Sequence, residues 1–356
     1  MKITQVMLSK GFGGAERYFV DLSLAQGKLG HEVQVICHKN FTQISRLRAA
    51  PGLHIDTVAP LGWWDLLARR RIGSAIARHR PEVVQAHLAR GAFMAGKTCT
   101  RLNIPLVVKL HNYVDLKYYS HADCLIATTA DQKNWLLDHG IASGNISVIP
   151  NFSSLQPVPV VTTSGKEELT IAAYGRLVRK KGFHVLLRAF RSLLDTGKKA
   201  VLRIGGDGPE RRALAALCMQ LGLDQHVQFW GWVEDVRAFA QTADLFVLPS
   251  LDEPFGIALL EMMALGMPIV ATRTQGPMEI LDDDCAWLIA AGDVTALASA
   301  LIDAADHGSK RTARAMQALH VFRTRYAESV VVPQIVSLYQ SLIAARSKQV
   351  SFTQPL

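Results

Sequence analysis

Two glutamates with a fixed spacing are the strongest chemical signal in the sequence. Glu253 and Glu261 are separated by seven residues in the segment Glu253-Pro254-Phe255-Gly256-Ile257-Ala258-Leu259-Leu260-Glu261, directly after the apolar run from Leu245 to Pro249. The run predicts a buried strand, and a helix is expected to begin near Gly256. Its first backbone N–H groups would form an anion site that the glycine lets a phosphate approach closely. Taken alone, the pair fits a functional site no better than a structural interpretation, in which Glu253 is an acid near a helix N-terminus and Glu261 is a solvated helix position.

A basic loop is the second candidate. The segment Ala173-Tyr174-Gly175-Arg176-Leu177-Val178-Arg179-Lys180-Lys181-Gly182 follows the predicted strand from Leu169 to Tyr174. Departure of a nucleoside diphosphate leaves negative charge on its oxygen, and fixed cations stabilise that charge more in the transition state than in the ground state. Arg176 and Lys181 are placed for this role, although basic residues before a helix are also common surface charge.

Glycines and histidines add weaker signals in the first half of the chain. Gly11-Phe12-Gly13-Gly14-Ala15-Glu16 closes the first strand, and a substrate or diphosphate could contact the amides of Gly13 and Gly14. The dinucleotide fingerprint G-x-G-x-x-G is not met, which disfavours a nicotinamide dehydrogenase. His87 ends the predicted strand from Val83, and His111 ends the predicted strand from Leu106. A histidine at a strand end is often only a satisfied core or capping residue.

Several of these segments resemble glycosyltransferase family 4. The family has an E-x7-E signature, and the Pro-Phe-Gly after Glu253 matches it. The resemblance implies that Glu253 contacts hydroxyls of the donor sugar and that Glu261 contacts the ribose of the nucleotide. The diphosphate is then expected at the backbone of Phe255, Gly256 and Ile257.

Other segments are similar to further elements of the same family. Gly175 to Gly182 resembles the G-R-L-x-x-x-K-G element, whose Arg and Lys hold the diphosphate, which implies that role for Arg176 and Lys181. Gly13 and Gly14 match the acceptor-side Gly-Gly-Ala-Glu loop. His111 matches a histidine near the reacting carbon of the donor sugar, and His87 matches a V-x-H-x-H-type strand in which Gln85 replaces the first His. Trp232 lies in the segment Trp230-Gly231-Trp232-Val233, which resembles the family's F-x-G-x-V loop and is therefore expected to frame the nucleotide base. Gly205 to Pro209 resembles a G-x-G-P turn of the family.

The elements that must position these residues alternate between short apolar strands and helices along the whole chain. This pattern predicts an α/β fold with two doubly wound Rossmann-like domains facing across a cleft, the GT-B arrangement. The predicted strands are 2–8, 32–37, 53–58, 83–87, 106–111, 124–128, 146–149, 169–174, 201–205, 227–230, 245–249, 268–272 and 286–289.

Domain boundaries follow from a change in composition. Residues 1–155 are predicted to form the acceptor-binding domain, and the Pro-, Ser- and Thr-containing segment 156–168 reads as a linker. Residues 169–328 are predicted to bind the nucleotide sugar. Residues 329–356 form a C-terminal helix and tail that can cross back onto the first domain.

The amino-acid composition limits which classes of protein the chain can belong to. With 356 residues, 49% hydrophobic and 19% charged, the chain is typical of a folded protein, and no apolar run approaches the roughly 20 residues of a membrane span. The N-terminus does not resemble a signal peptide, so a cytoplasmic location is expected. The five cysteines are far apart and predict neither zinc nor disulfides, so no metal is expected.

The positive charge is concentrated in the first half of the sequence. Residues 1–160 carry 18 Lys and Arg against 10 Asp and Glu, out of a net charge of +9 for the chain. Within this half, residues 61–72 combine the pair Trp63-Trp64 with Arg69-Arg70-Arg71. Two interpretations stay open: an interfacial helix peripheral to the inner face of an anionic membrane, or a core helix with a solvated basic end.

The function expected from these observations is transfer of a sugar, hexosyl or heptosyl, from a nucleotide diphosphate sugar to a lipid-linked or cell-surface glycan such as a lipopolysaccharide core. The resemblance implies retention of the anomeric configuration and no tightly bound cofactor. A nucleotide-sugar epimerase of the same architecture is the first alternative. A basic nucleic-acid-binding protein is the second, although no recognition motif is present.

Overall fold

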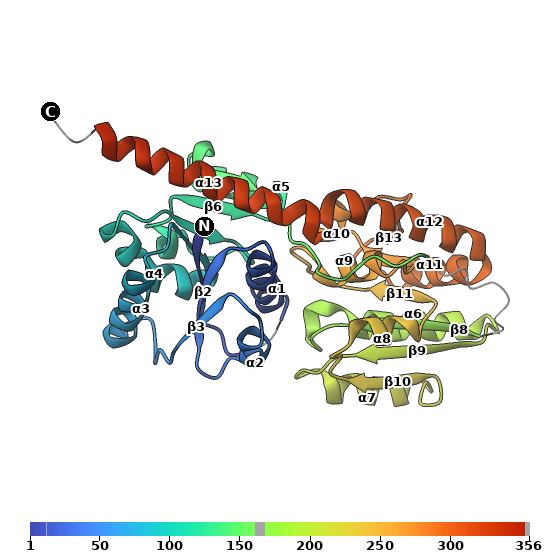
Figure 1. The fold of residues 1–356 in the computed structure, drawn as a ribbon. Helices are drawn as coiled ribbons and strands as arrows, with labels where there is room; N and C mark the ends of the chain where they lie inside the picture. The colour runs from blue at the N-terminus through green and yellow to red at the C-terminus, as the bar shows by residue number, and fades with distance from the viewer. Residues whose placement is uncertain (12, 161–167, 353–356) are drawn as a thin grey trace. The chain divides into compact units, whose positions relative to one another are not determined.

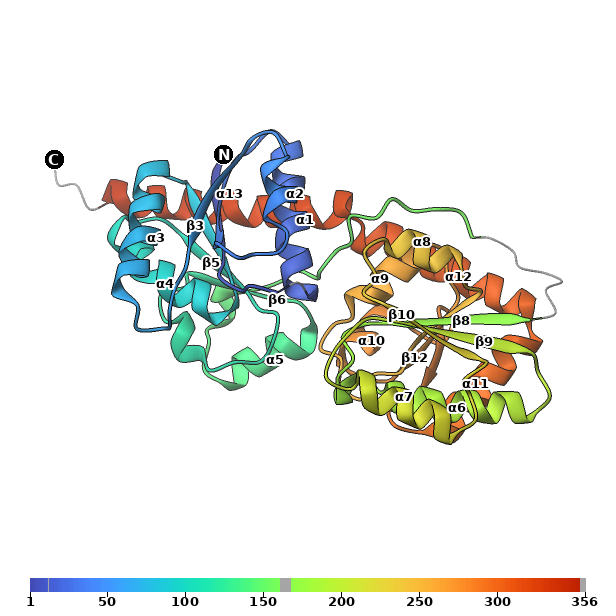
Figure 2. The same ribbon diagram turned by 90° about the horizontal axis from the view of Figure 1, so that it is seen from below.

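The chain is divided into two compact units in the computed structural model, which describes residues 1–11, 13–160 and 168–352, with side chains to residue 348. Unit 1 comprises Met1–Phe152 and Glu328–Leu356, and unit 2 comprises Ser153–Ala327. Each unit is a parallel β-sheet with helices on both faces (Figures 1 and 2). The prediction of two doubly wound α/β domains is confirmed.

Unit 1 is built on a parallel sheet of seven strands within the described residues, in the order β3-β2-β1-β4-β5-β6-β7. Its central strands are buried on both faces, which explains their nearly continuous apolar sequences. The strands are β1 (Lys2–Met7), β2 (Glu32–His38), β3 (Leu53–Val58), β4 (Val83–His87), β5 (Leu106–Lys109), β6 (Cys124–Ala127) and β7 (Ile146–Val148).

Helices connect these parallel strands, as crossover connections require. Helices α3 and α4 cover one face of the sheet, whereas α1 and α2 lie on the other (Figure 1). The connecting elements are α1 (Gly14–Lys28), α2 (Ile44–Arg48), α3 (Leu66–His79), α4 (Leu88–Arg101), η1 (Leu116–Tyr119), α5 (Ala130–Asp138) and η2 (Ser143–Asn145).

The final helix, α13 (Glu328–Phe352), belongs to unit 1 although it follows unit 2 in the chain. It packs against α1, and Tyr339 on it is fully buried. It begins at Glu328, one residue before the predicted C-terminal segment 329–356.

Unit 2 repeats the same architecture with a parallel sheet of six strands in the described residues, ordered β10-β9-β8-β11-β12-β13. Each of the thirteen predicted strands is present, with ends that differ by at most two residues. The strands of unit 2 are β8 (Leu169–Tyr174), β9 (Ala200–Gly205), β10 (Val227–Gly231), β11 (Leu245–Leu248), β12 (Ile269–Thr272) and β13 (Trp287–Ile289).

The helices of unit 2 also cover both faces of their sheet (Figure 2). Its elements are η3 (Arg179–Lys181), α6 (Phe183–Asp195), α7 (Arg211–Gln220), α8 (Val236–Gln241), α9 (Ile257–Ala264), α10 (Gln275–Ile280), α11 (Val294–Asp306), α12 (Gly308–Val321) and η4 (Phe322–Tyr326).

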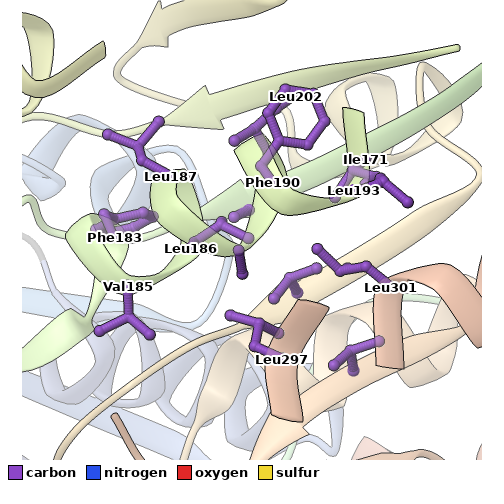
Figure 3. Close-up of a cluster of buried hydrophobic side chains, with 14 of the residues drawn as sticks. Ile171, Phe183, Val185, Leu186, Leu187, Phe190, Leu193, Leu202, Leu297 and Leu301 are labelled. Atoms are coloured by element: carbon purple, nitrogen blue, oxygen red, sulfur yellow. The ribbon is translucent and has the colours of Figure 1, made fainter. Parts of the chain in front are cut away.

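A hydrophobic core of unit 2 joins α6 and α11 to the sheet (Figure 3). Helix α6 presents Phe183, Leu186, Leu187, Phe190 and Leu193 at helical spacing, so that one face is apolar. These side chains contact strand residues such as Ile171 and Leu202, and Leu297 and Leu301 of α11. Full burial of each large apolar side chain contributes about 1.5–3 kcal/mol, and the resulting core holds the loops at the strand ends in place.

The predicted linker falls largely on residues 161–167, which lie outside the described residues. Its described part is attached to unit 2. The N–H group of Val158 donates to the Ala264 carbonyl at 2.9 Å, and Arg237 donates to the Gln156 carbonyl at 3.0 Å.

Candidate active site

Most of the predicted site residues follow strands at which the order of each sheet reverses, whereas His111 follows β5 and Trp232 follows β10. In unit 1 the reversal lies between β1 and β4, and in unit 2 it lies between β8 and β11. Crossover helices on opposite faces diverge at such a point and leave a crevice at the carboxyl ends of the strands, where ligands bind in folds of this kind. The candidate site is therefore described one unit at a time.

In unit 2, helix α9 begins where the sequence predicted. Gly256 is its N-cap residue, with φ +98°, a backbone conformation that a residue with a Cβ atom rarely adopts. Phe255 before it is buried and packs edge-on against Tyr326, with ring centroids 6.4 Å apart. Because the first N–H groups of a helix have no intrahelical partners, Ile257 and its neighbours present donors to an anion.

Glu253 and Lys181 form an ion pair just before this helix. Lys181 Nζ donates to Glu253 Oε2, and the Ser250 hydroxyl donates to the same oxygen at 3.2 Å. The Glu253 side chain is 8% exposed and that of Lys181 is 22% exposed. The pair therefore places one fixed cation and one oriented carboxylate next to the start of α9.

Close backbone packing brings these two residues together. Gly182 has φ +69°, and a Cβ atom at this position would lie 1.8 Å from the Pro249 carbonyl oxygen. The N–H group of Leu251 donates to the Lys180 carbonyl at 2.7 Å. The loop after β8 thus lies directly against the loop after β11, and Lys181 reaches Glu253 across 72 residues of sequence.

The other basic residues of the loop have different surroundings. Arg176 is exposed and has no ion-pair partner in the part of the chain that the structure describes. Lys180 forms a surface pair with Asp252 at 3.2 Å. Lys181 is thus the lysine that faces the E-x7-E segment, whereas Lys180 points to the neighbouring acid.

Glu261 lies on α9 and is only 3% exposed. The Tyr174 hydroxyl, at the end of β8, donates to Glu261 Oε2. Gly175 follows this tyrosine, and its N–H group donates to the Gly205 carbonyl at 3.1 Å. Trp232 follows β10 and is 51% exposed, so its ring is free to contact a ligand.

In unit 1, the glycine loop leads into α1. Gly13 is the N-cap residue, and its N–H group donates to the Glu16 carboxylate at 3.0 Å. Gly13 and Gly14 are exposed. A ligand that binds the Gly13 amide must therefore displace the Glu16 carboxylate. Phe12, the residue before Gly13 in the sequence, lies outside the described residues.

His87 and His111 form a stacked pair in the same unit. His87 ends β4, and His111 lies two residues beyond the last residue of β5, Lys109. Their ring centroids are 5.4 Å apart, and His87 Nδ1 is 3.1 Å from His111 Nε2. Leu88, the next residue after His87, has φ +62°, which is strained for a branched side chain.

Burial keeps both histidines neutral. It lowers the pKa of His87 to about 3, with a smaller effect from Lys109. It also lowers the pKa of His111 well below its ordinary value, with further effects from His87 and Lys109. At neutral pH each ring therefore has one N–H donor and one acceptor nitrogen.

Sequence reasoning missed several residues around these sites. Lys109 is fully buried, and its Nζ lies 5.1 Å from the centre of the Tyr18 ring. Gln5 accepts from His87, and Tyr174 binds Glu261. Their signal was a polar residue within an otherwise apolar strand, as in Lys109 and Gln5, which marks a buried hydrogen-bond partner.

The described residues contain no group of three or more His, Cys, Asp and Glu side chains arranged to hold a metal ion. The five cysteines are buried and unpaired. No described helix is long and apolar enough to cross a membrane. Near the start of α9, unit 2 brings together a helix amino end, Lys181 and the buried carboxylates of Glu253 and Glu261.

Family models match both halves of the chain. Residues 12–156 match the model described as Glycosyltransferase Family 4, and residues 159–319 match the model for glycosyl transferases group 1. The lipopolysaccharide core biosynthesis glycosyltransferase LpsD of Rhizobium meliloti (strain 1021) is 27% identical over 94% of this chain and 97% of its own length. LpsE of the same organism is 28% identical over 96% of this chain and 99% of its own.

Solved structures share the fold. Anabaena HepE, in complex with UDP and glucose, aligns with a TM-score of 0.82 and 20% identity over 96% of this chain and all of that one. WaaG, a glycosyltransferase of lipopolysaccharide biosynthesis, aligns with a TM-score of 0.73 and 18% identity over 95% of this chain and 99% of its own. At identities of 18–20%, these matches show that the chain shares the GT-B fold, and they show the fold alone.

Proposed function

Because this chain belongs to the family 4, group 1 glycosyltransferases, we propose that it transfers a hexosyl or heptosyl group from a nucleoside diphosphate sugar to a lipid-linked glycan of the lipopolysaccharide-core class. Full-length relatives named for lipopolysaccharide core biosynthesis support the acceptor class. They favour this function over an epimerase or a nucleic-acid-binding protein. The complexes of HepE with UDP and UDP-glucose make UDP-sugars the first donors to try.

The ion pair between Lys181 and Glu253 carries the proposal. The diphosphate binds at the N–H groups that begin α9, and Lys181 with Arg176 neutralises the charge on the departing oxygen. When the donor binds, Lys181 exchanges part of its contact with Glu253 for a phosphate oxygen. Glu253 then accepts hydrogen bonds from hydroxyls of the sugar, while Glu261 contacts the ribose and Trp232 borders the base.

We further propose that the reaction retains the anomeric configuration. The acceptor hydroxyl attacks from the face that the diphosphate leaves, and the departing phosphate oxygen accepts its proton, so no separate protein base is required. His111 is assigned to a hydroxyl of the donor sugar, and the loop at Gly13 and Gly14 is assigned to the acceptor.

A donor screen tests the function directly. Thermal unfolding should be measured with UDP-, GDP- and ADP-sugars, because a ligand that binds only the folded state raises the melting temperature. We expect one base series to raise it, and transfer to a lipopolysaccharide-core acceptor with that donor. Conversion of the donor without any acceptor would instead establish an epimerase.

No metal is required in this scheme, because Lys181 and Arg176 supply the positive charge at the diphosphate. We therefore expect transfer rates to be unchanged, within about twofold, after dialysis against EDTA. Loss of activity that Mg²⁺ or Mn²⁺ restores would contradict this assignment of the two side chains.

We also propose that unit 1 docks on an anionic membrane, at the inner face of the cytoplasmic membrane. The docking surface, named here the Trp64 surface, consists of Leu61, Trp64, Leu66 and Leu67, which are 84%, 74%, 65% and 66% exposed. Four large apolar side chains so exposed within seven residues suit insertion into an acyl boundary.

Charge supports a lipid partner for the Trp64 surface. Arg70 and Arg71 are exposed on the same helix, α3, and Arg69 lies beside them. Asp65 caps α3 by accepting from the Ala68 N–H group at 2.9 Å, which lowers the pKa of its carboxyl. Trp63, by contrast, stacks on Tyr118 with ring centroids 4.3 Å apart, so the paired tryptophans have different roles.

Vesicle co-sedimentation tests this docking. The protein should bind phosphatidylglycerol-containing vesicles, and the triple variant W64S/L66S/L67S should lose most of this binding. The matched control M219S/M316S removes side chains that are 62% and 60% exposed on unit 2 and should bind as the wild type does. Equal binding by all three proteins, or self-association through this surface in place of vesicle binding, would exclude the membrane partner.

A further inference from the structure

A connected set of buried polar side chains links α13 to the histidine pair of unit 1. The set comprises Gln5 on β1, Gln26 on α1, Gln85 and His87 on β4, and Tyr339 on α13. Each of these side chains is completely inaccessible to solvent. Burial of polar groups costs free energy unless their hydrogen bonds are made, so the set has a defined bonding pattern.

The pattern begins at the Tyr339 hydroxyl. It donates to Gln85 Oε1 and accepts from the side-chain amide groups of Gln5 and Gln26, each at 3.3 Å. Gln5 Nε2 also donates to Gln26 Oε1 at 2.9 Å. Both amide protons of Gln5 are therefore engaged, and its Oε1 is left as an acceptor.

That acceptor sets the proton position on His87. His87 Nε2 lies 2.8 Å from Gln5 Oε1, so this nitrogen carries the proton and donates it. Gln85 Nε2 lies 3.3 Å from the same nitrogen, but an amide nitrogen only donates, so this longer contact is not a hydrogen bond when His87 Nε2 is protonated. A neutral imidazole has a single N–H group, and the pKa of His87 is lowered to about 3, so its Nδ1 is an acceptor.

His111 is the next residue in this series of hydrogen bonds. Its Nε2 lies 3.1 Å from His87 Nδ1, and because that nitrogen accepts, His111 Nε2 donates. The remaining nitrogen of His111, Nδ1, then carries a lone pair. His111 is only partly buried, so a ligand can reach its ring.

We propose that Tyr339 is a positioning residue which, through Gln5 and His87, fixes His111 as the tautomer with an unprotonated Nδ1. This inference rests on the proposed function for its consequence: His111 Nδ1 accepts a hydrogen bond from a hydroxyl of the donor sugar. An analogue in which a fluorine replaces that hydroxyl loses the bond, so the tautomer contributes to donor recognition.

The C-terminal helix thereby takes part in the site of unit 1, although it is the last element of the chain (Figure 1). A role for α13 limited to packing would need only the apolar contacts of its buried residues, such as Val331, Val332 and Ile335. The Tyr339 hydroxyl has a separate role, because it accepts from Gln5 Nε2 and so leaves Gln5 Oε1 to accept from His87.

Nitrogen-15 NMR of the full-length protein, labelled at histidine, tests the inference without any substrate. Long-range proton correlations separate protonated from unprotonated ring nitrogens, and H87Q and H111N assign the signals. We expect His111 with a proton on Nε2 only. In Y339F the Gln5 amide loses the hydroxyl that accepts from its Nε2, so the amide can turn this nitrogen toward His87, and we expect the His87 and His111 signals to shift toward a mixture of tautomers.

Tyr119, another buried tyrosine of unit 1, provides the control. Y119F should leave both histidine signals unchanged. For Y339F, kcat/KM for the natural donor should fall about tenfold, the effect expected for one hydrogen bond. With a donor analogue in which fluorine replaces the contacted hydroxyl, Y339F should lower kcat/KM by a smaller factor, because that hydrogen bond is already absent.

The outcomes separate this inference from the proposed function. A proton on His111 Nδ1 in the wild type, or unchanged signals in Y339F, would overturn the tautomer assignment even if sugar transfer is observed. If NMR shows the expected tautomer but the protein binds no nucleotide sugar, the series of hydrogen bonds is supported and the proposed function is rejected.

Discussion

At the scale of single residues, the chemistry of unit 2 depends on which lysine faces the carboxylate. Lys180 and Lys181 are adjacent in sequence, yet Lys181 contacts buried Glu253 and Lys180 contacts exposed Asp252. The difference follows from the short helix η3, which turns consecutive side chains in different directions. Lys181 and Lys180 therefore offer a matched pair of substitutions.

We expect Lys181→Ala to lower kcat/KM by about 100-fold or more, because a fixed cation at the departing diphosphate is removed. Lys180→Ala should change kcat/KM by less than about threefold. Steady-state kinetics with the identified donor measures both. Since Lys181→Ala also leaves the buried Glu253 without its partner, its melting temperature should be recorded, and full activity in a folded Lys181→Ala protein would reject the assignment.

Buried His87 makes the stability of the fold depend on pH. The pKa of His87 is about 3 in the folded protein and about 6.5 in an unfolded chain. Below pH 6.5 the unfolded state therefore binds a proton that the folded state does not. The stability contributed by neutral His87 is complete above pH 6.5 and is lost as the pH falls toward 3, by up to about 1.4 kcal/mol for each pH unit.

Denaturant unfolding at pH 7 and pH 5 tests this linkage. Wild-type protein should lose stability between these values, and His87→Gln should lose less, although its stability at pH 7 is lower. His320→Gln, at an exposed position, is the control and should keep the wild-type pH dependence. An identical pH dependence in His87→Gln would show that the pKa of His87 is the same in the folded and unfolded states.

At the scale of elements, the contact between two loops decides whether the site of unit 2 forms. The loop after β8 and the loop after β11 come from neighbouring strands, and Gly182 allows their backbones to touch. The packed face of α6 begins at the next residue, Phe183, so the core and the site are joined at this glycine.

Gly182→Ala should destabilise unit 2 by at least about 2–3 kcal/mol, because φ is +69° and the new Cβ would lie 1.8 Å from the Pro249 carbonyl oxygen. Gly197→Ala is the matched control: its φ is +81°, but no atom lies within 4 Å of the new Cβ. The control should lose only about 1 kcal/mol. Chemical denaturation gives both values, and equal losses would mean that the loop contact is unimportant.

At the scale of the whole molecule, the net charge belongs to one unit. Unit 1 carries 20 Lys and Arg against 11 Asp and Glu, whereas residues 153–327 carry 19 of each. Charge of this kind bears on partners rather than on fold. The Trp64 surface lies on the charged unit, which is consistent with the proposed anionic membrane.

Binding to anionic vesicles should therefore weaken as salt rises. Arginines near a lipid surface each contribute about 1 kcal/mol at moderate salt, and screening shortens the range of that attraction. We expect the partition coefficient to fall at least tenfold between 0.05 and 0.5 M NaCl in co-sedimentation. R70E/R71E should reduce binding at low salt in the same way, whereas salt-independent binding would indicate insertion driven only by the apolar side chains.

Sequence by itself determined the strands, the fold class and the start of α9. These features depend on local apolar patterning and on glycines such as Gly256, whose signals are present within a few residues of sequence. The family 4 resemblance, confirmed by the matches over both halves, also rested on short segments. The roles assigned to Glu253, Glu261, Arg176, Lys181 and His111 stay predictions.

Only the tertiary structure decided which of these residues touch one another. Lys181 meets Glu253 because β8 and β11 are neighbours in the sheet, and Tyr339 meets Gln5 and Gln85 because α13 returns to unit 1. Such contacts join residues 72 to 334 positions apart. Local preferences carry no information on them, because they form only when the packed core selects one arrangement of the elements.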